Sequence, residues 1–381
     1  MGEKASRPGA GLFLQQAQVS EIVCRRAGAV ELLVQFAGRD TLEKALLYPD
    51  LCPQPVAVGD CLLLNTTAVE LALGSGGYHF VVANLSALAG DEDAAPRSAQ
   101  ELASAGHIMK LRYTPLQLRC LAVEEEAGPH HAVLQQADTL AQMPVVIAGL
   151  HSQIAPIAAA IKALASDQAR IAYIMNDTAG LALGFSRLAQ ELCEKRLLDV
   201  TITAGQAFGG QFEAVNIYSA LLAAKLAAQA DIAILCQGPG NVGTETRFGF
   251  GAVYQGEAVN AVSVLEGVPI AAVRLSFADP RPRHRGISQQ FLVALGKIAL
   301  RRAVIPLPTL AAEKLLLLQT QLKETGIDRQ HEVVLEEGEV GLEELRRRAI
   351  VVTSMGRSIA QDREFFLAAG AAGAAAAKRL K

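Results

Sequence analysis

From about residue 140 onward, short apolar runs alternate with segments of helical length. The runs consist almost entirely of Val, Ile, Leu and Ala, and segments such as QIAPIAAAIKALA and FEAVNIYSALLAAKLAAQ separate them. Strands without a polar face are typical of a parallel sheet that helices cover on both sides. The pattern therefore predicts a doubly wound, mostly parallel α/β domain over residues 141–381. The expected strands are 145–150, 171–176, 200–205, 232–237, 270–275, 303–308, 332–337 and 350–355.

Residues 1–140 follow a different pattern. Runs such as EIVCRRAGAVELLVQF and GSGGYHFVVANL are short and apolar, and glycine-containing turns interrupt or precede them. Short strands at close spacing with turn residues between them are typical of small barrels and sandwiches. We therefore expect a smaller β-rich, barrel-like domain in front of the α/β domain, with the boundary near residue 140.

The amino-acid composition argues against some classes of binding partner. The chain of 381 residues is 51% hydrophobic, has a net charge of −3 and contains no Trp. A negative net charge and a low content of aromatic residues argue against nucleic acid and anionic membranes as binding partners. The six cysteines form no CxxC pair, and the segment MGEKASRPGAGLFLQQ lacks the apolar core of a signal peptide. These features predict a cytoplasmic protein, and its apolar helices favour a homodimer.

Polar or glycine-rich turns follow six of the expected strands. Parallel strands end at one edge of a sheet, where helix N-termini present free N–H groups, so these turns are expected to line a ligand site. His151, Asp177 and Gln206 follow the first three strands, and Gly209 and Gly210 come shortly after Gln206. Taken singly, the serine and aspartate side chains of these turns could act only as helix caps, and the glycine pair could serve only a tight turn.

The segment GPGNVGTET follows the fourth strand and is the richest of these turns. Gly238 and Gly240 leave the backbone open to an anion, and Asn241, Thr244 and Thr246 add polar side chains. The glycines have the G-x-G-x-x-G spacing of dinucleotide sites, but they do not follow the first strand of the domain, and no P-loop lysine follows them. The sequence leaves two main interpretations open, an anion cradle and a structural glycine loop.

A basic loop, RLSFADPRPRHRGIS, follows the fifth strand. Arg281, Arg283 and Arg285 are candidate counter-charges for a carboxylate or phosphate group, and Arg274 and His284 add to the local basic character. The alternative is a solvated charge run whose arginines pair with acidic neighbours.

Catalytic signals are sparse. His151, Asp177 and His284 are candidate proton carriers, but no spacing defines an acid–base pair, and neither a nucleophile elbow nor an HExxH motif is present. A carboxylate metal site formed by Asp177, Glu213 and Asp279 is an alternative that these residues leave open, and we predict no metal. The motifs identify no cofactor.

Four segments, HSQ, ITAGQAFGGQFEAVNIYSALLAA, GPGNVGTETRFGFGAV and RLSFADPRPRHRGIS, resemble an uncharacterised bacterial family, domain of unknown function 3866. The resemblance extends over essentially the whole chain. It implies a bacterial cytoplasmic protein and carries no catalytic assignment.

Two functional hypotheses follow. In the first, the carboxyl edge of the sheet binds an anionic, possibly phosphorylated small molecule, with or without catalysis. In the second, the protein is a non-catalytic sensor or scaffold that uses the same edge for a ligand or a partner chain. Convergence of the candidate proton carriers on one pocket would favour catalysis.

Overall fold

The computed structural model of the protein describes residues 11–89 and 106–380. By its internal contacts the chain divides into two compact units, residues 1–102 with 114–118, and residues 103–113 with 119–381. The domain boundary expected near residue 140 stays a prediction.

The first unit is a closed five-stranded barrel with the order β1-β2-β3-β5-β4, in which β3 and β5 are parallel and the other pairs antiparallel. Alternate side chains of β4 are buried, as a barrel wall requires. Greek-key barrels of this size include the OB type, but a fold does not by itself define a ligand. Its elements are β1 (Leu14–Arg26), β2 (Ala29–Phe36), β3 (Leu42–Leu47), β4 (Cys61–Asn65), α1 (Thr67–Glu70), β5 (Tyr78–Asn84) and α2 (Leu85–Ala89).

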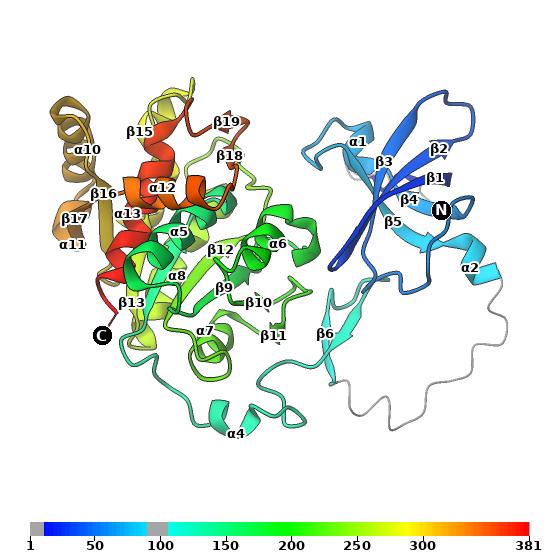
Figure 1. The fold of residues 1–381 in the computed structure, drawn as a ribbon, viewed down its shortest axis with the longest axis horizontal. Helices are drawn as coiled ribbons and strands as arrows, with labels where there is room; N and C mark the ends of the chain where they lie inside the picture. Colours follow the sequence, from blue (N-terminus) through cyan, green and yellow to red (C-terminus); the bar gives the residue numbers. More distant parts are fainter. Residues whose placement is uncertain (1–10, 90–105, 381) are drawn as a thin grey trace, which may run out of the picture. The chain divides into compact units, whose positions relative to one another are not determined.

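The second unit is built on an eight-stranded sheet with the order β11-β10-β9-β12-β8-β13-β16-β17, in which all neighbouring strands are parallel. The fold class predicted from the sequence, a parallel α/β sheet preceded by a smaller barrel, is confirmed (Figure 1). The strands are β8 (Pro144–Ala148), β9 (Ile171–Asn176), β10 (Val200–Ala204), β11 (Phe212–Ala214), β12 (Ile232–Gln237), β13 (Val268–Ala272), β16 (Val304–Pro308) and β17 (Glu332–Glu336).

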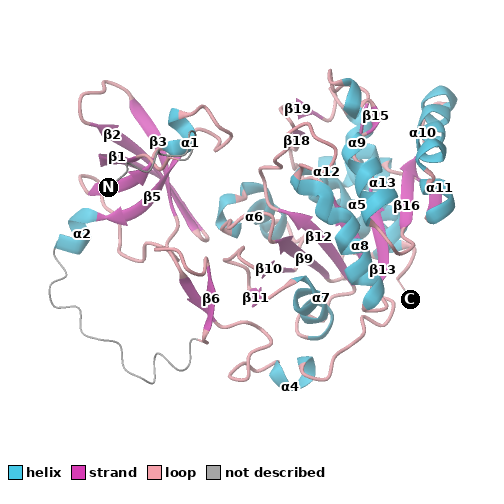
Figure 2. Cartoon of the chain, turned by 180° about the vertical axis from the view of Figure 1, so that it is seen from behind, coloured by secondary structure: helices cyan, strands magenta, loops and turns pink. Residues whose placement is uncertain are grey.

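Helices cover both faces of this sheet (Figure 2). One hydrophobic cluster joins the strands to α7, α8, α9 and α10, and another joins them to α5, α6, α12 and α13. The strand side chains in these clusters are almost completely buried, which is why the strands lack the polar alternation of a half-exposed sheet. The helices are α4 (His131–Leu134), α5 (Ile154–Ala165), α6 (Arg187–Glu194), α7 (Ile217–Leu226), α8 (Tyr254–Val264), α9 (Gln289–Val293), α10 (Ala312–Thr325), α11 (Ile327–Gln330), α12 (Glu339–Arg347) and α13 (Arg363–Ala377).

The strand order creates a switch point between β8 and β12. The chain leaves β8 for α5, which packs in one cluster, whereas it leaves the neighbouring β12 for α8, which packs in the other. Adjacent connections that go to opposite faces open a crevice at the carboxyl ends of the strands, which is where ligands bind in doubly wound folds.

The prediction of a strand at 350–355 is wrong. Residues 350–352 form no strand, and β18 (Thr353–Ser354) and β19 (Arg357–Ser358) pair with each other in a small antiparallel hairpin outside the parallel sheet. The apolar run was misleading because Ile350 and Val352 are buried against the helix layer rather than within the sheet. Two further small sheets pair β6 (Ile108–Lys110) with β7 (Leu118–Cys120), and β14 (Leu275–Ser276) with β15 (Gly286–Ile287).

Candidate functional site

A large cavity, of about 1140 Å³, lies at the switch point. Its walls come from the turn after β8, the loop between β12 and α8, the loop between β13 and α9, and the β18–β19 hairpin. The first three segments are far apart in the sequence and meet because their strands end at one edge of the sheet, whereas the hairpin lies outside that sheet.

The structure brings eight of the predicted site residues to this cavity. The other six predicted residues do not line the cavity. The lining includes His151, Gly238, Gly240, Asn241, Thr246, Arg281, Arg283 and His284, and it does not include Asp177, Gln206, Gly209, Gly210, Thr244 or Arg285.

The residues outside the lining have their own partners. The amides of Gly209 and Gly210 donate to Glu213 Oε1 at 2.7 Å and to Thr203 Oγ1 at 3.1 Å. This arrangement matches the tight-turn interpretation of the glycine pair, here between β10 and β11. Gln206 accepts a hydrogen bond from the backbone of Arg112.

Asp177 and Arg285 are likewise separate from the cavity lining. Burial raises the pKa of Asp177, which accepts a backbone hydrogen bond from Gln206. Arg285 is exposed, and its carbonyl accepts a hydrogen bond from Gln321 Nε2 at 3.1 Å. The three candidate proton carriers therefore do not meet at one pocket, because only His151 and His284 line it.

The glycine-rich loop forms one wall of the cavity. Gly240 has a φ of +101°, a conformation that side chains disfavour, and an added Cβ there would meet open space. Among the described residues, no acceptor pairs with the backbone N–H groups of residues 240–242. The loop is anchored by Asn241, whose Oδ1 accepts from Ala252 N at 3.1 Å. The wall thus presents free backbone donors on a fixed support.

Thr244 and Thr246 behave differently from the rest of this loop. Their hydroxyl oxygens are 2.9 Å apart, Thr244 donates to the carbonyl of Gly249, and Gly249 N donates to Thr246 Oγ1 at 3.2 Å. These contacts close a local turn. The glycines do not open a helix either, since α8 begins only at Tyr254, which is unlike the dinucleotide-binding arrangement.

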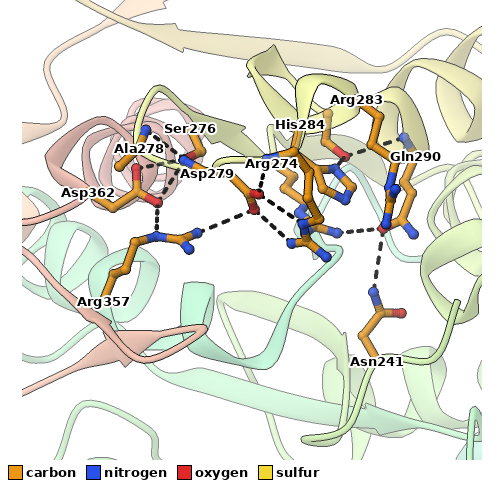
Figure 3. A network of polar contacts seen from close by, with 12 residues as sticks. Asn241, Arg274, Ser276, Ala278, Asp279, Arg283, His284, Gln290, Arg357 and Asp362 are labelled. Atoms are coloured by element: carbon orange, nitrogen blue, oxygen red, sulfur yellow. Dashed lines mark hydrogen bonds and ion pairs between the residues drawn. The ribbon is translucent and has the colours of Figure 1, made fainter.

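Beside the cavity, four charged side chains neutralise one another. Arg281 donates to both carboxylate oxygens of Asp279, at 2.9 and 2.7 Å. Arg357 bridges Asp279 at 3.4 Å and Asp362 at 3.0 Å, and the Ser276 hydroxyl donates one bifurcated hydrogen bond to both carboxylate oxygens of Asp362 (Figure 3). The hydrogen bonds from Arg281 hold the pKa of Asp279 well below its usual range.

Arg274 is the exception in this cluster. It is 8% exposed and lines the cavity, and its Nη1 donates to Gln290 Oε1, which also accepts from Asn241 Nδ2 at 3.5 Å (Figure 3). Among the described residues no carboxylate pairs with Arg274. Burial, together with the positive charge of Arg281, lowers the pKa of the guanidinium to about 10. A buried cation without a counter-ion is unfavourable, and an anion in the cavity would relieve it.

The two histidines of the lining are neutral at pH 7. Burial lowers the pKa of His151 to about 4, and its ring contacts Ser186 Oγ at 2.6 Å and the Gln237 carbonyl at 3.3 Å. Burial and the charge of Arg274 lower the pKa of His284 to about 4, and its Nδ1 lies 2.7 Å from Ser288 Oγ. Neither ring contacts a carboxylate that would make it a general base of the usual kind.

A family model described as Protein of unknown function (DUF3866) matches residues 44–373, which are most of the chain. The protein belongs to this family. The resemblance drawn from the sequence is thereby confirmed. No curated protein and no solved structure matches the chain.

In this DUF3866 protein, the described residues contain no cluster of three or more His, Cys, Asp or Glu side chains that could hold a metal ion. Glu213 contacts Lys110 at 2.5 Å and Asp279 contacts Arg281, so these carboxylates already have cationic partners. Within the same described ranges, no helix is long and apolar enough to cross a bilayer.

Sequence reasoning missed the amide side chains that hold the site of this DUF3866 protein together. Gln237 Nε2 donates to the Gly149 carbonyl at 2.9 Å, and Gln153 Nε2 donates to the Val273 carbonyl at 3.0 Å. Both glutamines are buried, and they tie the ends of neighbouring strands to each other. Gln237 ends an otherwise apolar strand, and that position was the only signal available from the sequence.

Proposed function

We propose that the protein binds an anionic small molecule in the cavity at the switch point of its parallel sheet. The observation that carries the proposal is Arg274, a buried guanidinium that faces the cavity and has no carboxylate partner among the described residues. The backbone N–H groups of residues 240–242, which have no acceptor among the described residues, supply further donors from the glycine-rich loop. Buried arginine forks and backbone N–H groups are the donors that proteins use for carboxylate and phosphate groups.

The arrangement supports binding rather than acid–base catalysis. Asp177 does not line the cavity, and both lining histidines have a lowered pKa. The charge of the barrel also fails to favour a nucleic-acid ligand, because residues 11–89 contain seven carboxylates and four Lys or Arg side chains. A sensor or scaffold role for the same edge is compatible with ligand binding. The cytoplasmic location and the homodimer stay predictions from the sequence.

Thermal unfolding in the presence of phosphorylated and carboxylated metabolites tests the proposal. A ligand at 100 times its Kd stabilises the folded protein by about 2.7 kcal/mol and raises Tm accordingly. In R274Q we expect the affinity to fall by about ten- to a hundredfold, since a hydrogen bond to a charged group contributes about 1.5–3 kcal/mol.

The matched control is R329Q, which removes an exposed arginine that does not line the cavity. This variant is expected to bind as the unmodified protein does. An anion that stabilises the protein and R274Q equally would place its site elsewhere and refute the proposal.

A further inference from the structure

The charges of the cavity wall, taken together, leave a surplus of two cations. The tetrad of Arg281, Arg357, Asp279 and Asp362 is neutral as a group. The remaining charged side chains of the lining are Arg247, Arg274, Arg283, Lys297, Glu245 and Glu324. The Arg283–Glu245 ion pair, at 2.7 Å, is one of the contacts that offset charge within this group.

A surplus of two on a chain whose net charge is −3 is a local feature of this site. A monocarboxylate would neutralise only half of it, whereas a phosphoryl group carries close to two negative charges at pH 7. A tetrahedral dianion also has enough oxygens to accept from a guanidinium and from several backbone amides at once. The charge balance therefore favours a dianionic group over a monoanionic one.

His284 lies within this cationic cluster and lines the cavity. Its Nδ1 contacts Ser288 Oγ at 2.7 Å, and Ser288 Oγ also accepts from Gln290 N at 3.3 Å. The hydroxyl can therefore donate its proton to Nδ1, which leaves Nε2 as the ring nitrogen for a ligand. Both ring nitrogens become donors when the imidazole is protonated, and Ser288 Oγ can then accept from Nδ1.

The charged groups that act on His284 come from three parts of the fold. Arg274 follows β13, and Asp279, Arg281 and Arg283 belong to the loop that contains His284. Two further charged residues of the lining are Lys297, in the helical turn that follows α9, and Glu324, in α10. Burial is the largest effect that disfavours a protonated imidazole, and in the absence of an anion the arginines of this set add to it.

We propose that the cavity binds a dianionic phosphoryl group through Arg274 and the amides of residues 240–242, and that His284 takes up a proton when the group binds. The proposal rests on the proposed function and names the ligand class and the proton-linked residue of that site. The dianion neutralises the arginines that otherwise repel the imidazolium, and it accepts from Nε2–H. Binding and protonation therefore favour each other.

The size of the cavity indicates that the phosphoryl group belongs to a larger molecule. Its volume of about 1140 Å³ slightly exceeds the range for small-molecule sites, which is about 300–1,000 Å³. Phe250, Leu292 and Val293 add apolar surface to the lining. A phosphate monoester of a small organic molecule fits this combination better than inorganic phosphate does.

The test uses sulfate, a dianion that does not titrate between pH 5 and 8, so that any pH dependence of its binding belongs to the protein. Isothermal titration calorimetry in two buffers of different ionisation enthalpy gives the number of protons taken up. We expect sulfate affinity to be about tenfold higher at pH 5.5 than at pH 7, if the bound-state pKa of His284 returns to its ordinary value near 6.5. In H284N the change is expected to be less than about twofold.

A second histidine variant, H331N, serves as the control. His331 is also buried with a lowered pKa, but it does not line the cavity. It should retain the pH dependence of sulfate binding. Thermal unfolding of each variant shows whether it is folded at both pH values, and H284Q offers a second replacement if H284N is not.

The outcomes separate this inference from the proposed function. Sulfate binding that requires Arg274 but shows no proton uptake, or the same uptake in H284N, refutes the inference alone. If acetate binds as tightly as sulfate, the proposed preference for a dianionic group is refuted. Glucose 6-phosphate is the probe for phosphate esters. If sulfate, acetate and glucose 6-phosphate all fail to bind in an Arg274-dependent way, both proposals fail.

Discussion

Replacement of Arg274 by Met should make the anion-free protein more stable and abolish its response to anions. The side chain is 8% exposed and lacks a carboxylate partner among the described residues, so the folded protein carries a buried charge without an ion-pair partner at pH 7. Methionine fills much of the same volume with an unbranched apolar chain, which allows it to pack in the place of the guanidinium stem.

The magnitude follows from the pKa of the guanidinium, which falls from 12.5 to about 10. Each pK unit corresponds to about 1.4 kcal/mol, so the charged form is disfavoured in the folded state by about 3 kcal/mol. A basic group whose pKa is lowered in the folded state destabilises that state while the group is charged. This penalty on the free energy of unfolding is therefore present throughout the pH range below about 10. Loss of the hydrogen bond to Gln290 offsets about 1–2 kcal/mol of the gain. We expect R274M to be more stable by about 1–2 kcal/mol.

Urea unfolding at pH 7 in a buffer free of phosphate and sulfate measures this difference through the midpoint of the transition. Addition of sulfate should then stabilise the unmodified protein and leave R274M unchanged, so that the order of stabilities narrows or reverses at high sulfate. A variant that is less stable than the unmodified protein without anions, and that still responds to sulfate, would show that Arg274 is a satisfied structural residue.

Three further predictions concern the surroundings of the cavity. In Q290L the acceptor for Arg274 and Asn241 is lost, and we expect anion affinity measured by calorimetry to fall about tenfold; unchanged affinity would show that Gln290 does not position the guanidinium. G240A forces a side chain into a φ of +101° and should lower both stability, by about 1–2 kcal/mol, and anion affinity, whereas the matched variant G59A, at a φ of +96° in the barrel, should lower stability alone. Removal of the Ser276 hydroxyl in S276A withdraws its hydrogen bonds from the buried Asp362 and should lower the free energy of unfolding by about 1–3 kcal/mol in urea titrations, and a neutral result would indicate that Arg357 alone satisfies the carboxylate.

Much of the architecture could be predicted from local pattern. Seven of the eight expected strands are strands of the parallel sheet, because continuous β-branched and apolar runs between helical segments are compatible with few other environments. The short edge strand β11 was not expected, since its FEA sequence has no apolar run. The prediction of a strand at 350–355 was wrong because this segment does contain an apolar run. Burial against helices requires the same apolar residues as burial in a sheet, so the run does not distinguish the two.

The position of the cavity was predictable from the sequence, and the residues that line it were less so. Turns at strand ends identified His151, Gly240 and Arg281 as neighbours across more than a hundred residues of sequence. They could not separate Gly209 and Gly210, which complete the turn before the edge strand β11, from the glycines next to the switch point. Strand order decides which of the turns at one sheet edge share a cavity, and strand order is not encoded in any single segment.

The sequence by itself determined the periodicity of the elements, their burial and the edge at which polar residues gather, because these properties depend on residues close to one another in the chain. The tertiary structure alone decided which charges are paired. Arg274, Arg281 and Arg283 look alike in the sequence, yet Arg281 pairs with Asp279 and Arg283 pairs with Glu245, whereas Arg274 donates to the amide oxygen of Gln290 and has no carboxylate partner among the residues that the structure describes. Electrostatic pairing acts over a few ångströms in space, and the fold rather than the spacing along the chain sets those distances.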